Sequence, residues 1–212
     1  MQPLRQAAFL RARYRAILAY AGLIHLLLGL FIISPLLVLL AWPEEAGQTP
    51  AFLIPGLGLM AWGGLLWLVL RPREPVPLTL AEGAVIVLLA WVAAMVVGAL
   101  PLMPSVGLSF SQAAFEAISG WTTTGLSVVD VTKASHLVLL YRSTMQLVGG
   151  AGLAIMMLAA FGGPVGAGLS SAEGRDRQLV PHVKRSVRLV WSIYLGYIAA
   201  GKIGRASCRE RV

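Results

Sequence analysis

Four long apolar runs constrain this chain more than any other feature of its sequence. They span residues 16–42, 51–70, 78–100 and 136–161, and each reaches the roughly 20 residues that a helix needs to cross a bilayer. The composition agrees, because 58% of the residues are hydrophobic and only 12% are charged. We therefore expect an all-α membrane protein, built as a transmembrane helix bundle.

The basic residues are distributed unevenly along the chain. A net charge of +8 could indicate nucleic-acid binding, but the lysines and arginines cluster at the ends of the apolar runs. Residues 1–15, 71–77 and 162–188 hold four, two and five of them, whereas the opposite set of loops holds only Lys133. This positive-inside pattern predicts a multi-pass protein of the cell (inner) membrane with a cytoplasmic N-terminus, and no nucleic-acid partner.

A polar stretch too short to span a bilayer lies between the third and fourth runs. Ser109 and Gln112 stand as the N-cap and N3 residues of a capping box, which predicts a short helix over Ser111–Gly120. Ten helical residues measure about 15 Å, roughly half of a hydrocarbon core. We therefore expect one re-entrant pore helix that enters from the outer surface and stops inside the membrane.

Three threonines follow the expected pore helix. Their β-branched side chains disfavour helix at 122–124, and Gly120 and Gly125 on either side permit backbone angles that other residues avoid. Irregular backbone at membrane depth is tolerated only where it is buried in protein or lines a water-filled cavity. A half-length helix whose negative end faces an extended Thr/Gly strand is the arrangement of a cation selectivity-filter loop. The alternative is a threonine-rich loop at the outer surface.

Two motifs resemble a known family. Residues 115–125, Phe-Glu-Ala-Ile-Ser-Gly-Trp-Thr-Thr-Thr-Gly, resemble the first pore loop of the Trk/Ktr/HKT potassium transporters, most closely the bacterial Trk-type membrane subunit. Residues 142–152 are similar to the Arg-x-x-x-Gln-x-x-Gly-Gly-x-Gly start of the helix that follows this loop. The resemblance implies potassium-channel-like units, each helix–pore loop–helix, four to a pore. It assigns 16–77 to two leading transmembrane helices and 78–161 to the first unit.

The resemblance also implies a substrate and partners. Potassium would bind the backbone carbonyls of Thr122, Thr123, Thr124 and Gly125, with or without a threonine hydroxyl. No cofactor and no side-chain catalysis are implied, so the protein is not expected to be an enzyme. Such proteins form homodimers and work with a peripheral, nucleotide-binding cytoplasmic subunit. The basic loop from Arg175 to Arg188 is a candidate docking surface for that subunit.

The charges and glycines next to the expected filter loop predict an ion pair and a close helix contact or hinge. Glu116 and Arg142 sit at similar depths on adjacent elements, and pairing removes most of the cost of each intramembrane charge. The alternative is that Arg142 extends to the outer headgroups while Glu116 faces a water-filled vestibule. Gly149, Gly150 and Gly152 serve either close helix packing or bending and gating.

Other positions carry structural expectations. Pro35 should kink the first run, and His25 should face a neighbouring helix rather than relay protons. Glu82 should pair with Arg71 or Arg73. Close helix packing is expected at four glycines of the second run, namely Gly56, Gly58, Gly63 and Gly64.

The C-terminal part departs from the family pattern. After the basic loop 162–188, residues 189–201 begin another apolar run, which is too short to cross. Residues 202–212, which include the single cysteine Cys208, look like a non-native tail. We therefore interpret the chain as an N-terminal fragment that does not carry potassium current alone.

Two rival functions come from other classes. A non-transporting membrane scaffold or assembly subunit has the same helices and no functional filter. An intramembrane serine hydrolase would use Ser119 as nucleophile with His25 or His136 as base, within hydrogen-bond reach.

Overall fold

The structure is a computed structural model that describes residues 2–72 and 78–152, together with Ser192 and Gly196. Within these residues the chain is helical and contains no strand. The elements in chain order are α1 Gln2–Ile33, η1 Ser34–Leu40, η2 Pro43–Gln48, α2 Thr49–Leu70, α3 Leu80–Ala99, α4 Leu102–Val106, α5 Phe110–Trp121 and α6 His136–Ala151. The predicted all-α bundle is confirmed.

Within the described residues, three segments are long and apolar enough to cross a membrane. They are Phe9–Leu40, Pro43–Leu70 and Ala81–Val106, close to the first three predicted runs. The fourth predicted run, 136–161, is helical from His136 to Ala151, and residues 153–161 lie outside the described residues. So do residues 73–77, the basic loop 162–188, the tail, and all of 189–201 except Ser192 and Gly196.

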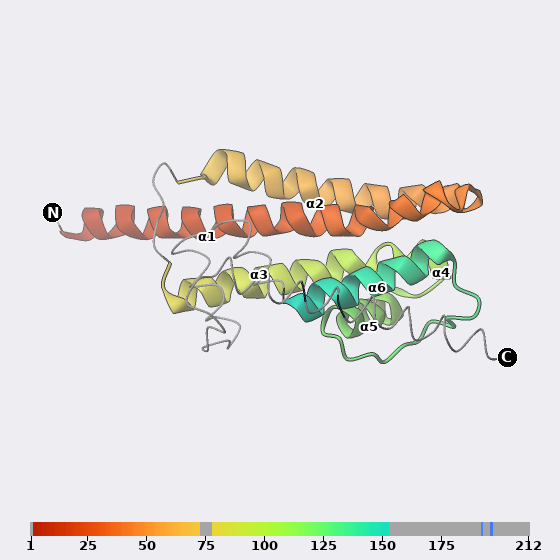
Figure 1. Cartoon of the computed structure of the whole chain (residues 1–212). Helices are drawn as coiled ribbons and strands as arrows, with labels where there is room; N and C mark the ends of the chain where they lie inside the picture. The colour runs from red at the N-terminus through yellow and green to blue at the C-terminus, as the bar shows by residue number, and fades with distance from the viewer. Residues whose placement is uncertain (1, 73–77, 153–191, 193–195, 197–212) are drawn as a thin grey trace.

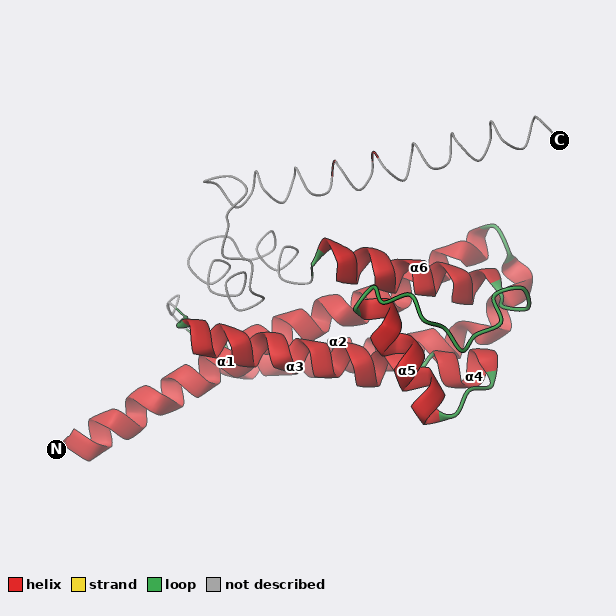
Figure 2. Cartoon of the chain, turned by 90° about the horizontal axis from the view of Figure 1, so that it is seen from below, coloured by secondary structure: helices red, strands yellow, loops and turns green. Residues whose placement is uncertain are grey.

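The helices form two layers (Figure 1). The long helices α1 and α2 run side by side as an antiparallel hairpin, while α3, α5 and α6 lie together on one side of it. Figure 2 shows the short helix α5 lying between the longer helices and the green loop that leads to α6. This arrangement packs one face of a half-length helix against α3 and α6.

The N-terminal basic arm, residues 1–15, is helical. From Gln2 onward it belongs to α1, which is one helix to Ile33. After Pro3, which sits in the first turn, the sequence contains good helix formers and no glycine before residue 22, so nothing interrupts the helix. Figures 1 and 2 show this end of α1 projecting beyond the other helices.

Pro35 ends the first α-helix. A proline inside a helix lacks an N–H donor and clashes with the carbonyl four residues earlier, here that of Phe31. The α-helix stops at Ile33, a 3₁₀ helix continues from Ser34 to Leu40, and the Ser34 hydroxyl donates a hydrogen bond of 2.9 Å to the Phe31 carbonyl. The predicted irregularity is therefore a change of helix type.

The α1–α2 contact is made through glycines that face one another. A Cβ added to Gly63 would lie against the carbonyl of Gly22, and one added to Gly56 would lie 3.0 Å from the carbonyl of Gly29. The predictions for Gly56 and Gly63 are confirmed. Those for Gly58 and Gly64 are wrong, because Gly58 has no heavy atom within 4 Å of such a Cβ and Gly64 has only a contact at 4.0 Å.

Among the described residues, Arg13 and not Arg71 is the ionic partner of Glu82. Glu82 accepts hydrogen bonds from Arg13 of α1. Arg73, the other predicted partner, lies outside the described residues. The reason is that the first helix continues through residue 13 and brings that guanidinium to the start of α3. Glu82 also completes the capping box of α3 with Thr79.

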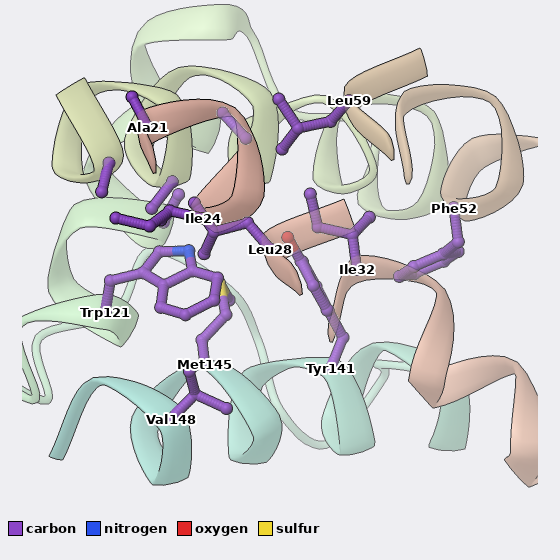
Figure 3. Close-up of a cluster of buried hydrophobic side chains, with 14 of the residues drawn as sticks. Ala21, Ile24, Leu28, Ile32, Phe52, Leu59, Trp121, Tyr141, Met145 and Val148 are labelled. Carbon is purple, nitrogen blue, oxygen red and sulfur yellow. The ribbon is translucent and has the colours of Figure 1, made fainter. Parts of the chain in front are cut away.

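His25 faces another helix, as expected. Its Nε2 lies 3.4 Å from the Leu89 carbonyl of α3, and only 7% of the residue is exposed. The hydrophobic core runs along the same interface and includes Ile24, Leu28 and Ile32 of α1 together with Trp121, Tyr141 and Met145 (Figure 3).

Candidate selectivity filter and its supports

The pore helix begins with a capping box. The Ser109 side chain accepts from the backbone N–H of Gln112, and the Gln112 side chain accepts from the backbone N–H of Ser109 at 3.0 Å. The helix that follows, α5, has 12 residues and measures about 18 Å. The predicted bounds Ser111–Gly120 were one residue short at each end, because Phe110 and Trp121 are also helical.

The helix ends in a Schellman motif at the threonine run, with Thr123 as the left-handed residue. The N–H groups of Thr122, Thr123 and Thr124 donate to carbonyls of Ile118, Gly120 and Ser119 at 2.9, 3.1 and 3.0 Å. These bonds satisfy carbonyls that a helix end leaves without partners. They also attach the first residues of the filter stretch directly to the negative end of the pore helix.

The backbone of the threonine run is left-handed at two positions. Thr123 has φ 57° and Gly125 has φ 82°. A β-branched residue in this region is strained by about 1–2 kcal/mol, and such strain gathers at functional sites. Thr123 is the only non-glycine residue with positive φ among the residues that the structure describes.

The carbonyls of this stretch are open. Thr122, Thr123, Thr124 and Gly125 are all exposed. Within residues 2–72 and 78–152, no hydrogen bond ends on their carbonyl oxygens. Two of the threonine hydroxyls form hydrogen bonds instead. Thr122 Oγ1 donates to the Ile118 carbonyl and lies 2.7 Å from Thr124 Oγ1. Unpaired carbonyl oxygens are the groups that replace the hydration shell of a potassium ion.

Glu116 joins the pore helix to two other segments. Its carboxylate lies 2.9 Å from Arg142 Nη2 of α6. It also accepts from the Ser127 hydroxyl and from the backbone N–H of Val128 at 2.9 Å. The expected Glu116–Arg142 pair is therefore present in the structure, and the same carboxylate holds the loop, residues 126–128, that follows the threonine run.

Ser119 forms a second hydrogen bond to the loop that follows the threonine run. Its hydroxyl donates to the Leu126 carbonyl at 2.5 Å, and the residue is only 4% exposed. Ser119 and Glu116 are three residues apart, so both project from one face of α5 toward residues 126–128. Sequence reasoning missed this role of Ser119 and Ser127; the i, i+3 spacing of Glu116 and Ser119 was the available signal.

Gly149 allows α6 to touch the end of the pore helix. A Cβ added there would overlap the backbone carbonyl of Trp121, the last residue before the threonine run. Gly150 lies in the last described turn of α6, and Gly152 follows it with φ 82°. These contacts explain Gly149 by close packing, whereas bending or gating by Gly150 and Gly152 remains a prediction.

The N-terminal end of α6 is capped by a residue of η2. Glu45 accepts from the backbone N–H groups of His136 and Leu137 at 2.9 and 2.8 Å, and from His136 Nδ1 at 2.9 Å. The His136 ring also stacks on Trp42, with centroids 4.3 Å apart. This contact between distant segments was not predicted, because the sequence does not indicate which helix the outer loop reaches.

The loop 126–135, between the threonine run and α6, carries an exposed acid, Asp130. Asp130 accepts from the Thr132 hydroxyl at 2.6 Å and from the Thr132 backbone N–H at 3.0 Å. These two bonds hold the pKa of the Asp130 carboxyl below its usual value. Asp130 is therefore an anion within this loop.

The hydrolase arrangement is not formed by the residues proposed for it. The Ser119 hydroxyl donates to a carbonyl, His25 faces Leu89, and His136 faces Glu45. A serine nucleophile needs a base that accepts its proton, and neither of these two histidines is its hydrogen-bond partner. The described part of the chain also holds no group of three or more metal-ligating side chains.

Comparison with known proteins gives one family. A family model described as TrkH, a cation transport protein, matches residues 48–203. The chain is 34% identical over 191 residues to the Trk system potassium uptake protein TrkH of Salmonella typhimurium, covering 86% of this chain and 39% of that protein. It is 30% identical over 190 residues to an uncharacterized cation transporter of Methanocaldococcus jannaschii, covering 85% and 39%.

A solved structure agrees with these sequence matches. The potassium transporter TrkH from Vibrio parahaemolyticus aligns with a TM-score of 0.67 at 25% identity, covering 88% of this chain and 38% of that one. The chain spans about two fifths of the length of the curated relatives it matches. The relatives are named as transporters and not as enzymes. The all-α fold and the family match lead to one conclusion: this integral membrane protein belongs to the TrkH family of cation transport proteins.

Proposed function

We propose that this chain supplies part of a potassium-uptake pore, with Thr122, Thr123, Thr124 and Gly125 as its segment of the selectivity filter. The observation that carries the proposal is the set of open carbonyls at the end of a half-length helix that packs against α3 and α6. In a pore with four such loops, these oxygens would surround a dehydrated cation. The relatives named as potassium uptake proteins support potassium as the substrate.

The placement and partners of the protein belong to the same proposal. The positive-inside distribution of lysine and arginine favours an inner-membrane protein with a cytoplasmic N-terminus. The family resemblance supports a homodimer with a peripheral, nucleotide-binding cytoplasmic subunit. We place the docking surface of that subunit at 175–188, where four arginines and Lys184 gather in the sequence.

The test uses the full-length protein in cells that lack other potassium uptake systems. The wild type should restore growth at low potassium. Gly125→Ala should abolish or strongly reduce uptake, because an alanine at φ 82° forces the filter backbone to change. Gly107→Ala is a matched control, since Gly107 has φ 73° and, like Gly125, open space around it, but lies at the end of α4.

The controls distinguish the rival functions. A scaffold or assembly subunit predicts that both variants behave alike, because neither glycine contacts another residue through a Cβ position. Equal loss in both variants, or a wild type without potassium uptake, would overturn the transport proposal. Labelling of Ser119 by a fluorophosphonate probe would instead favour a hydrolase.

A further inference from the structure

We propose that Gly98 of α3 is a positioning residue for the filter. Because Gly98 has no side chain, it leaves the space that the Trp121 indole occupies, here called the Trp121 seat. The position of Trp121 in this seat sets where Thr122 begins. The inference rests on the proposed function, because it concerns how the filter is held. Gly98 lies in the last turn of α3, whereas Trp121 is the last residue of α5. The two elements pack together in the bundle.

The fit between Gly98 and Trp121 leaves no room for a methyl group. A Cβ built on Gly98 lies 2.8 Å from Trp121 Nε1 and 3.3 Å from the Tyr141 hydroxyl. Real Cβ atoms essentially never approach a heavy atom within 3.0 Å. The indole is a rigid ring, and Trp121 is 1% exposed, so the ring cannot swing away without displacing its neighbours.

The α3 side of the seat is fixed by Tyr141. Its hydroxyl donates to the Gly98 carbonyl at 2.7 Å, and the residue is fully buried. Its ring packs edge-on against Phe52 of α2, with centroids 5.2 Å apart. Tyr141 therefore ties the Gly98 peptide to α6, and the seat cannot retreat from an added methyl group.

The opposite side of Trp121 is fixed by α6. The Trp121 carbonyl lies against Gly149, where a Cβ would overlap it, and Gly120 lies over Met145, with its Cβ position 3.2 Å from Met145 Cε. Figure 3 shows Met145 and Val148 beneath the Trp121 indole. Trp121 is thus held between glycines of two helices, one at its ring and one at its carbonyl.

This seat matters because the next four residues lack such contacts. Thr122–Gly125 are exposed, and the Trp121 carbonyl group is bonded directly to the Thr122 nitrogen. A displacement of the indole must therefore pass to the start of the filter. Misplacing a functional group by about 1 Å can cost about 100-fold in rate. Residue 98 is thus expected to influence which cation the filter accepts.

The experiment compares the potassium-to-sodium uptake ratio of full-length variants. Gly98→Ala should lower the ratio at least about tenfold, an effect of the size that small misplacements produce. Gly98→Ala/Trp121→Phe should recover the ratio of Trp121→Phe alone, because phenylalanine lacks the Nε1 atom that the methyl group meets. Gly58→Ala is the control, since this mid-helix glycine has open space.

Each outcome decides the inference. A Gly98→Ala protein that keeps the wild-type ratio, even with less folded protein in the membrane, would overturn it. So would a double variant that stays as impaired as Gly98→Ala. If Gly98→Ala does not fold, Tyr141→Phe serves instead, because losing the bond to the Gly98 carbonyl should also lower the ratio; an unchanged ratio would overturn the inference.

Failure of the proposed function would look different. It would appear as a wild type that transports no potassium. The seat is then tested by thermal stability alone: Gly98→Ala should lower the melting temperature, and adding Trp121→Phe should restore it to the value of Trp121→Phe. Absence of that recovery would show that no steric seat exists.

Discussion

Arg142 Nη2 lies 2.9 Å from Glu116 Oε1, and the two side chains are only 13% and 2% exposed. The same carboxylate accepts the backbone N–H of Val128, three residues after the filter stretch. The ion pair therefore does more than neutralise two charges within the bundle. It connects α5 and α6 to the backbone that leaves the proposed filter.

Removing either charge should destabilise the full-length protein. Glu116→Gln and Arg142→Gln should each lower the free energy of unfolding by about 3 kcal/mol, because the remaining charge is buried without its partner. The double variant should lose at least about 1 kcal/mol less than the sum of the single losses. Unfolding in detergent micelles, followed by tryptophan fluorescence, measures the cycle. Strict additivity would show that the pair contributes no coupling.

The loop after the proposed filter, residues 126–128, should become less protected from hydrogen exchange when Ser119 loses its hydroxyl. Ser119→Ala leaves the Leu126 carbonyl without this donor and should cost about 1–2 kcal/mol. Ser143→Ala is the control, because its hydroxyl bonds only to the Leu139 carbonyl of its own helix and is exposed. Hydrogen exchange at residues 126–128 should rise in the first variant and stay unchanged in the second. Equal exchange in both would argue against the attachment.

The stability that the cap at the N-terminal end of α6 provides should depend on Glu45 and not on Glu44. Glu45→Ala removes the acceptor of two backbone N–H groups at the start of α6 and should cost about 1 kcal/mol, as other N-cap losses do. Glu44→Ala is the matched control, since Glu44 is exposed. The melting temperature in detergent is the readout. A larger loss for Glu44→Ala would contradict the observed contact.

The α1–α2 contact should discriminate between adjacent glycines. Gly63→Ala places a methyl group 2.7 Å from the Leu26 nitrogen and should force the helices apart. Gly64→Ala meets only Leu26 Cδ1 at 4.0 Å and should be neutral, or stabilising by up to about 1 kcal/mol through helix propensity. The melting temperatures of the two proteins should therefore shift in opposite directions, or only the first should fall. Similar losses would indicate a looser interface.

The pore helix could be predicted from sequence because its signals are local. Ser109 and Gln112 form their capping box within four residues, and the glycines and threonines that end the helix lie together at residues 120–125. The Glu116–Arg142 pair was accessible for a related reason. Two opposite charges at similar depth have few alternatives inside a membrane.

The contacts that sequence reasoning missed join segments far apart in the chain. Arg13 reaches Glu82 across 69 positions, and Glu45 reaches Leu137 across 92. Their pairing depends on how the α1–α2 hairpin lies against the rest, which no local pattern specifies. Gly98 was missed for a similar reason: its importance comes from the shapes of two side chains on other helices.

The facing glycines of α1 and α2 have a consequence for how the chain enters the membrane. Gly22 meets Gly63, and Gly29 meets Gly56, so each contact is satisfied by residues made before α3 begins. The first two helices can therefore associate before α3 and the helices after it join the fold. α3 would then pack against a hairpin whose two helices already contact each other.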